Sequence, residues 1–234
     1  MTRILALDSS TEACSAALLS GEMVLHRYAD APRAHTQLLL PMVDELLAEA
    51  NLRLEDLDAI AFGRGPGSFT GIRIATSMAQ GLAFAVDKPL LAISTLAALA
   101  QGVLETYKDS VSPEIILAAI DARMAEIYWA AYRVDADGLV CLCGEEQLSP
   151  PAQISIDALQ SLPANAIIYA AGSGWNFADQ IPLSARISKQ YPSLLPNTVH
   201  IAKLAARDFL NGLGQSAEDA LPVYLRDKVA WQNG

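Results

Sequence analysis

The sequence contains the same pattern twice, and this repeat constrains the fold more than any other feature. The run from Ile4 to Asp8 is apolar and ends in an aspartate, and Ile115 to Asp121 is a second such run. A turn and two further segments with strand-like patterning follow each run. The expected strands cover residues 3–8, 14–19 and 23–29 in the first half, and 115–121, 126–134 and 139–143 in the second. A unit that recurs in this way indicates an internal duplication.

Helical and strand segments alternate after each set of three strands. In the first half we expect helices over 36–50, 70–86 and 95–107, with strands over 59–64 and 90–94 between them. The second half is a looser copy, with helices over 152–161 and 198–213 and a strand over 166–170. We therefore expect two βββαβα lobes with mixed sheets flanked by helices, the duplicated ribonuclease H-like arrangement that actin, sugar kinases and Hsp70-type ATPases share. The expected lobes are residues 1–109 and 110–234, and the tail over 218–234 is a candidate to pack back on the first lobe.

Composition excludes several other classes of protein. Of the 234 residues 52% are apolar and 18% charged, which is typical of a folded domain and not of a disordered chain. The net charge is 16 − 26 = −10, so the average field of the chain opposes direct binding of nucleic acid. We expect a cytoplasmic protein with no membrane partner, because the sequence has neither a signal peptide nor a run of about 18 apolar residues.

Metal binding is not expected either. The three cysteines, Cys14, Cys141 and Cys143, have no second ligand pair near them. A metal-binding helix that begins at His35 would need a second histidine one turn later, where the sequence has Leu39.

Two loops at predicted strand ends could hold a nucleotide. Backbone N–H groups and hydroxyls at the carboxyl ends of strands are the groups that cradle phosphate. The residues of such a residual phosphate loop would be Asp8, Ser9, Ser10, Thr11, Gly172 and Gly174. The alternative is an ordinary turn, and the lack of a glycine in the first loop favours that alternative.

The most distinctive stretch is Gly63-Arg64-Gly65-Pro66-Gly67-Ser68-Phe69-Thr70-Gly71-Ile72-Arg73. It matches neither a Walker loop nor a dinucleotide-binding fingerprint, so a ligand loop and a tight strand–helix turn are both open. No Gly-x-Ser-x-Gly motif occurs, and the sequence predicts no catalytic residue. The helix that follows carries one charge, Arg73, up to Val86. A helix that is apolar all round needs cover on both sides, which predicts either a protein interface or a place inside a three-layer core.

Several segments resemble the bacterial TsaB (YeaZ) family. They are residues 4–15, His35-Thr36-Gln37, the stretch from Gly63 to Arg73, the stretch from Asp121 to Tyr128, and residues 222–231. The resemblance is dense in the first half and at the tail, and it is sparse between residues 141 and 197. It implies an actin-like protein without catalysis of its own that partners TsaD, the paralogue that transfers a threonylcarbamoyl group from threonylcarbamoyl-AMP to N6 of adenosine 37 in tRNAs reading codons that begin with A.

The resemblance also implies the rest of the assembly. TsaE, a P-loop ATPase, would join the complex, so that ATP or ADP and a metal ion belong to the partner subunits, and tRNA is reached only through them. TsaD-like enzymes carry His-x-x-x-His on the first helix, and Leu39 replaces the second histidine here, which agrees with the absence of a metal site. The first-lobe helices would contact TsaD or a second copy of this chain. The expected interface residues are His35, Leu38, Leu39, Met42, Leu46, Phe69, Ile72, Arg73, Thr76 and Ala79.

Two other functions stay open from the sequence. One is an actin-like ATPase or kinase that uses Asp8 and the loop from Gly172 to Gly174 for its own nucleotide. The other is a peptidase that acts on TsaD.

Overall fold

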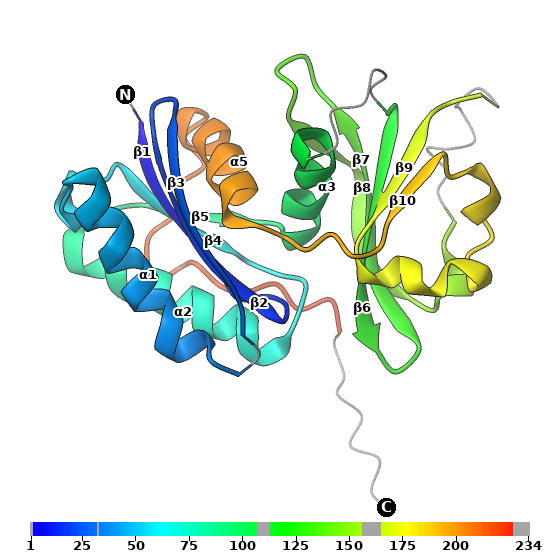
Figure 1. Ribbon diagram of the computed structural model, residues 1–234, viewed down its shortest axis with the longest axis horizontal. Helices are drawn as coiled ribbons and strands as arrows, with labels where there is room; N and C mark the ends of the chain where they lie inside the picture. Colours follow the sequence, from blue (N-terminus) through cyan, green and yellow to red (C-terminus); the bar gives the residue numbers. More distant parts are fainter. Residues whose placement is uncertain (1, 32, 107–112, 156–164, 227–234) are drawn as a thin grey trace, which may run out of the picture.

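The fold consists of two five-stranded sheets with helices between and beside them (Figure 1). The structure is a computed structural model, and it describes residues 2–31, 33–106, 113–155 and 165–226. The first sheet has the order β3-β2-β1-β4-β5, and the second has the order β10-β9-β6-β7-β8. The strands are β1 (Arg3–Asp8), β2 (Ala13–Ser20), β3 (Met23–Asp30), β4 (Ala59–Gly63), β5 (Leu90–Ile93), β6 (Ile115–Arg123), β7 (Glu126–Val134), β8 (Val140–Ser149), β9 (Ile168–Ala171) and β10 (Lys189–Tyr191).

The two sheets have the same topology, which confirms the duplicated fold. In each, the first three strands form an antiparallel meander, and two further strands add in parallel beside the first strand. Parallel neighbours need a crossover connection, and the helical segments after β4 and β9 supply it. This is the two-lobed actin-like arrangement that the repeat predicts.

Two helices cover one face of the first sheet, and two others lie between the sheets. Helices α1 (His35–Ala50) and α2 (Phe69–Val86) pack on β2 and β4, and α3 (Thr95–Thr106) and α5 (Thr198–Leu210) fill the space between the sheets (Figure 1). Short 3₁₀ helices cover Leu54–Asp56, Pro151–Gln153, Ser173–Gln180 and Ser184–Arg186. None of the helices in the described ranges has the length and apolar content needed to cross a bilayer.

The two central helices each pack on the sheet formed by the other half of the sequence. Helix α3 follows β5 of the first sheet but contacts β6, β7, β8 and β9, whereas α5 contacts β1, β2, β4 and β5. A division of the sequence near residue 109, which falls outside the described ranges, therefore leaves one helix of each half on the opposite sheet. The lobe boundary itself stays a prediction.

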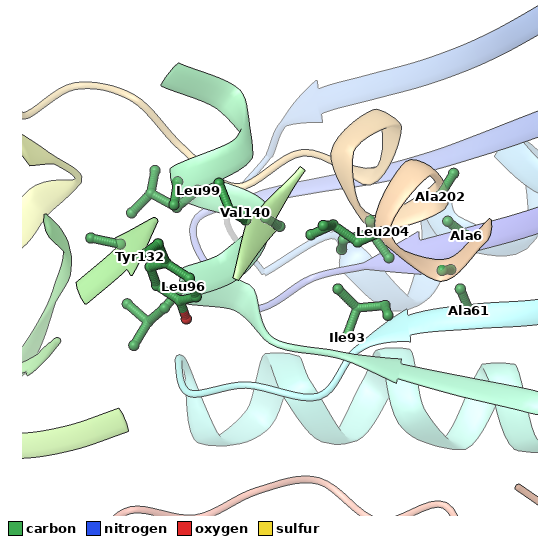
Figure 2. Close-up of a cluster of buried hydrophobic side chains, with 14 of the residues drawn as sticks. Ala6, Ala61, Ile93, Leu96, Leu99, Tyr132, Val140, Ala202 and Leu204 are labelled. Atoms are coloured by element: carbon green, nitrogen blue, oxygen red, sulfur yellow. The ribbon is translucent and has the colours of Figure 1, made fainter. Parts of the chain in front are cut away.

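The exchange of helices produces one core that joins both sheets. Side chains alternate along β1, so that Ile4 and Ala6 face the central helices while Leu5 and Leu7 face α1 and α2. Figure 2 shows the central cluster, in which the small side chains Ala6 and Ala61 lie beside Ala202 and Leu204 of α5. Tyr132 and Val140 of the second sheet belong to the same cluster as Leu96 and Leu99 of α3.

The second lobe departs from the expected elements in three places. Strand β8 continues to Ser149, six residues beyond the expected end, because an edge strand with exposed polar side chains lacks the apolar pattern used to find strands. The expected helix over 152–161 is a 3₁₀ turn at Pro151–Gln153, and its residues from 156 on lie outside the described residues. The loop after β9 continues as the 3₁₀ helix Ser173–Gln180, whose Trp175 is buried, and the short strand β10 follows it.

The described part of the C-terminal segment runs back along the first lobe. Gln215 exchanges two backbone hydrogen bonds of 2.9 Å with Leu90 on the edge strand β5. The Gln80 side chain of α2 donates to the carbonyls of Ala217 and Ala220. Residues from 227 to the end of the sequence lie outside the described ranges.

Candidate functional site

The predicted phosphate loop at the end of β1 contains a buried carboxylate. Asp8 is 1% exposed, and one of its oxygens accepts a hydrogen bond of 2.9 Å from the Ser10 hydroxyl. The other oxygen, Oδ1, has no hydrogen-bond partner among the described residues. Burial raises the pKa of Asp8 to about 6, although hydrogen bonds from the Ser10 side chain and from the backbone of Ser9 and Ser10 lower it.

The glycine-rich loop packs directly on this first loop. The Ser68 N–H donates to the Ser10 carbonyl at 2.8 Å, and the Ser9 hydroxyl donates to the Gly71 carbonyl at 2.8 Å. A Cβ atom at Gly71 would lie 1.8 Å from the Ser9 carbonyl oxygen, and one at Gly67 would lie 2.4 Å from that of Ser10. These glycines are therefore required by contact within the chain. The close contact is what a tight strand–helix turn requires in this part of the glycine-rich stretch.

The second predicted phosphate loop, with Gly172 and Gly174, packs on a different strand. Gly172 has φ 98°, and a Cβ at Gly172 or Gly174 would collide with Ala119 of β6. No hydrogen bond or ion pair among the described residues joins this loop to Asp8, Ser9, Ser10 or Thr11. The structure thus brings Asp8 together with Gly63 and the loop that follows it, since a Cβ at Gly63 would lie 2.0 Å from Asp8 Oδ1.

The two strand-end turns of the lobes face each other through an ion pair. Arg123, the last residue of β6 before the turn to β7, lies 3.5 Å from Glu12, in the turn between β1 and β2. Arg123, Met124 and Ala125 all have positive φ, which is a strained path for residues other than glycine. Arg226 of the C-terminal segment stabilises this turn through an ion pair of 2.7 Å with Glu126 and a hydrogen bond to the Ala122 carbonyl.

A polar cluster that the sequence does not indicate joins the lobes near their edge strands. Arg64 Nη2 lies 2.9 Å from Glu146 Oε2, and the Ser94 hydroxyl donates to the other oxygen of Glu146. The Tyr132 hydroxyl lies 3.3 Å from that of Ser94, and burial, together with the charge of Glu146, raises the pKa of Tyr132. These four side chains line a cavity of about 270 Å³. A sequence pattern could have pointed to Arg64 but not to Glu146, which lies in the unexpected part of β8.

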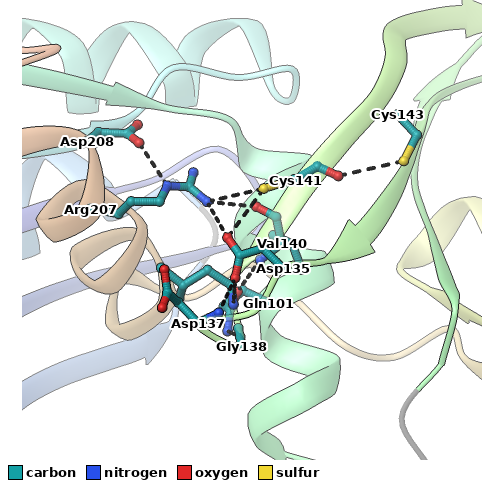
Figure 3. A network of polar contacts seen from close by, with 10 residues as sticks. Gln101, Asp135, Asp137, Gly138, Val140, Cys141, Cys143, Arg207 and Asp208 are labelled. Atoms are coloured by element: carbon teal, nitrogen blue, oxygen red, sulfur yellow. Dashed lines mark hydrogen bonds and ion pairs between the residues drawn. The ribbon is translucent and has the colours of Figure 1, made fainter. Parts of the chain in front are cut away.

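A second polar network fixes the hairpin between β7 and β8 to the central helices (Figure 3). Arg207 of α5 donates to the Val140 carbonyl at 3.0 Å, and the Gln101 side chain of α3 accepts from the Val140 N–H at 2.9 Å. Arg207 also lies 3.2 Å from Asp208 and 3.7 Å from Asp135. Each of these groups contacts at least one other member of the network, so the network has a structural role between the lobes.

Most of the predicted interface side chains point into the core. Leu39, Leu46 and Ala79 are fully buried, and Ile72, Thr76, Met42 and His35 are between 2% and 8% exposed, while Leu38 is half-buried. These side chains hold α1 and α2 on the sheet and leave almost no surface for a partner. Of the ten residues, Phe69 and Arg73 are exposed. The outer face of α2 instead consists of Phe69, Thr70, Arg73, Ser77, Gly81, Phe84 and Ala85, with Arg73 as its single charge.

The described residues contain no group of three or more side chains that could hold a metal ion. His35 is buried and its Nδ1 has no hydrogen-bond partner within the described ranges, while Leu39, one turn later, is fully buried against the sheet. The chain therefore presents no donor set for a metal at the start of α1 among the residues described.

The topology of the two sheets defines the class of this chain, a duplicated actin-like protein. Its glycine-rich loop packs on the loop that follows β1. A family model described as TsaD, tRNA N6-adenosine threonylcarbamoyltransferase, matches residues 29–232. Curated relatives named tRNA threonylcarbamoyladenosine biosynthesis protein TsaB are 41% identical in Escherichia coli K12 and 40% in Haemophilus influenzae. The alignments cover 98% of this chain and 97% or 95% of those proteins.

Solved structures agree with this grouping. YeaZ from Pseudomonas aeruginosa is 46% identical, with a TM-score of 0.87 over 96% of this chain and all of that one. A second Pseudomonas aeruginosa structure, described as an uncharacterised protein with similarity to peptidase YeaZ, has a TM-score of 0.89 at 46% identity over 97% of this chain and all of that one. The chain belongs to the TsaB family of tRNA threonylcarbamoyladenosine biosynthesis proteins.

Proposed function

We propose that this chain is a non-catalytic, activating subunit for threonylcarbamoylation of N6 of adenosine 37 in tRNAs that read codons beginning with A. It acts in complex with TsaD and TsaE, and it reaches tRNA through them. Membership of the TsaB family supports a role in this modification. Nucleotide and metal would belong to the partner subunits.

The observation that carries the proposal is the exposed face of α2. Phe69 is 53% and Phe84 76% exposed, Ser77 and Gly81 lie between them, and Arg73 is the single charge on this face. An exposed helix face of this kind favours contact with another protein over contact with water. TsaD is the proposed partner, and a second copy of this chain is the other candidate for the same face.

A second candidate function is an actin-like ATPase or kinase, and Asp8 is the observation that favours it. One oxygen of its buried carboxylate has no hydrogen-bond partner in the described part of the chain, and it lies at the end of β1, where ligands bind in α/β sheets. The packing of Ser68 and Gly71 on the same loop argues against it, because phosphate would have to displace them. Titration of the isolated chain with ATP and Mg²⁺ separates the two functions, since stoichiometric binding would favour the enzyme.

A peptidase that acts on TsaD is the third possibility, and the description of one solved relative mentions peptidase YeaZ. Labelling with a serine-directed probe, followed by incubation with TsaD and mass analysis, tests it. We expect neither labelling nor cleavage.

Reconstituted tRNA modification tests the main proposal. The reaction contains TsaD, TsaE, threonylcarbamoyl-AMP synthase, ATP, bicarbonate, threonine and tRNA, with or without this chain. We expect modified adenosine only when the chain is present. Equal product without it would refute the proposal.

A matched pair of variants tests the contact surface in the same reaction. Ser77→Glu places a charge on the exposed face of α2, and Ser193→Glu places one at an exposed position of the second lobe. We expect loss of product with the first variant and full product with the second. A charge at Ala79 would not be informative, because that side chain is fully buried and the variant would misfold.

A further inference from the structure

Three exposed side chains meet at the beginning of α2, two from the helix itself and one from the C-terminal segment. The Arg73 guanidinium lies 3.6 Å from the centroid of the Phe69 ring and 5.4 Å from that of the Tyr224 ring. Arg73 Nε donates to the Tyr224 hydroxyl at 2.7 Å, although the two residues are 151 positions apart. We refer to Phe69, Arg73 and Tyr224 as the Arg73 cluster.

The Arg73 cluster faces solvent. Phe69 is 53% exposed and Tyr224 42% exposed, and Arg73 is exposed between them. Among the described residues, no carboxylate lies within ion-pair distance of Arg73, and none accepts a hydrogen bond from its two terminal nitrogens. Tyrosine and arginine are enriched among the residues that dominate binding at protein interfaces.

The cluster is already ordered in the free chain. The Val223 N–H donates to the Arg64 carbonyl at 2.8 Å, which fixes the backbone beside Tyr224. The bonds from Gln80 to Ala217 and Ala220 hold the preceding part of the C-terminal segment on α2. Ordering an arginine side chain costs conformational entropy on binding, and a preformed geometry removes much of that cost.

We infer that the Arg73 cluster anchors a protein partner that presents a carboxylate to the terminal N–H groups of Arg73, with apolar side chains around it on Phe69 and Tyr224. A carboxylate matches the fork geometry of a guanidinium and can accept two parallel hydrogen bonds. The inference rests on the proposed function for the identity of the partner, TsaD. It adds the C-terminal segment to the contact surface.

Charge favours a protein carboxylate over nucleic acid. The chain carries a net charge of −10, and α1, which packs beside α2, exposes Asp44 and Glu45. The many phosphates of a nucleic acid would be repelled by these nearby carboxylates. A single carboxylate on the surface of a protein partner can contact Arg73 alone.

The test compares three variants in a binding titration with purified TsaD. Arg73→Gln removes the charge, Tyr224→Phe removes the hydroxyl that holds Arg73 Nε, and Arg53→Gln is the control, because Arg53 is an exposed arginine paired with Asp56. We expect a dissociation constant about 30-fold higher for Arg73→Gln, several-fold higher for Tyr224→Phe, and within about twofold of the unchanged chain for Arg53→Gln. The double variant should bind no more weakly than Arg73→Gln alone, since both changes disable one anchor.

All three side chains are exposed, so the variants should fold, and unchanged melting temperatures would verify this. An Arg73→Gln variant that binds TsaD normally, while Ser77→Glu does not bind, would overturn the inference and leave the proposed function standing. If the unchanged chain does not bind TsaD, both are overturned. Loss of self-association or of tRNA binding by Arg73→Gln, with TsaD binding intact, would also overturn it, in favour of a second copy or of nucleic acid.

Discussion

The buried carboxylate of Asp8 predicts an unusual dependence of stability on pH. Burial raises the pKa of Asp8 to about 6 in the folded chain, against about 3.9 for an aspartate in an unfolded chain. As the pH rises, Asp8 therefore releases its proton at a higher pH in the folded state than in the unfolded state. This group contributes stability that is fully present below about pH 4 and is lost as the pH rises through 6.

The size of the effect follows from the shift. A difference of about two between the folded and unfolded pKa values corresponds to about 3 kcal/mol of stability. This is an upper value, because the chain can relax around the charge. Asp8→Asn has no charge to bury at any pH. The stability of the variant relative to the unchanged chain should thus increase by about 2–3 kcal/mol between pH 4 and pH 8. Any constant difference between an amide and a carboxyl group cancels in this comparison.

Urea unfolding of both proteins at several pH values between 4 and 8 measures the effect. Asp44→Asn serves as the control, because Asp44 is exposed on α1, and its difference from the unchanged chain should stay within a few tenths of a kcal/mol. If the difference between Asp8→Asn and the unchanged chain does not vary with pH, the carboxylate is not held in the buried, partly unbonded state described here.

Three further predictions concern packing and ion pairs. Gly71→Ala places a Cβ 1.8 Å from the Ser9 carbonyl oxygen and should lower the stability of the fold by several kcal/mol. Gly81→Ala places a Cβ with nothing within 4 Å and should raise the stability by about 0.5–1 kcal/mol. Thermal unfolding of the two variants measures both effects. Burial alone would raise the pKa of Glu105, but hydrogen bonds from His200 and Lys203 lower it to about 2, so Glu105→Gln should cost about 1–3 kcal/mol at pH 7 and progressively less as the pH falls from about 4 to 2. Glu146→Gln leaves Arg64 without its ionic partner and should cost about 2 kcal/mol in urea unfolding, and a variant as stable as the unchanged chain would contradict the role of this pair between the lobes.

The order of strands could be predicted from sequence because alternation and turn residues are local signals. The strands from Arg3 to Ile93 occur within one or two residues of their expected ends, and both sheets repeat one topology. The placement of α5 on the first sheet could not be predicted in the same way. Its apolar stripe indicates that one face is buried, but not which of two similar sheets buries it.

Eight of the ten predicted interface residues are buried or half-buried for a related reason. Apolar side chains at helical spacing, such as Leu39, Leu46 and Ala79, are the ones that a helix turns toward its own sheet. Several exposed positions on α2 are small or weakly polar, as Ser77 and Gly81 are, and a sequence pattern does not distinguish them from ordinary surface. The aromatic Tyr224 joins this surface only through the path of the C-terminal segment.

The packing that fills the Asp8 loop also fixes the beginning of α2. Ser68 caps the helix through the Gly71 N–H, while its own N–H binds the Ser10 carbonyl, and the Ser9 hydroxyl binds the Gly71 carbonyl. Each of these bonds uses a group that a phosphate loop would turn toward its ligand. The same bonds hold rigid the first turn of α2, where Phe69 and Arg73 are exposed. This packing therefore preforms the exposed end of α2, and a preformed surface lowers the entropy cost of binding a partner there, as the proposed function requires.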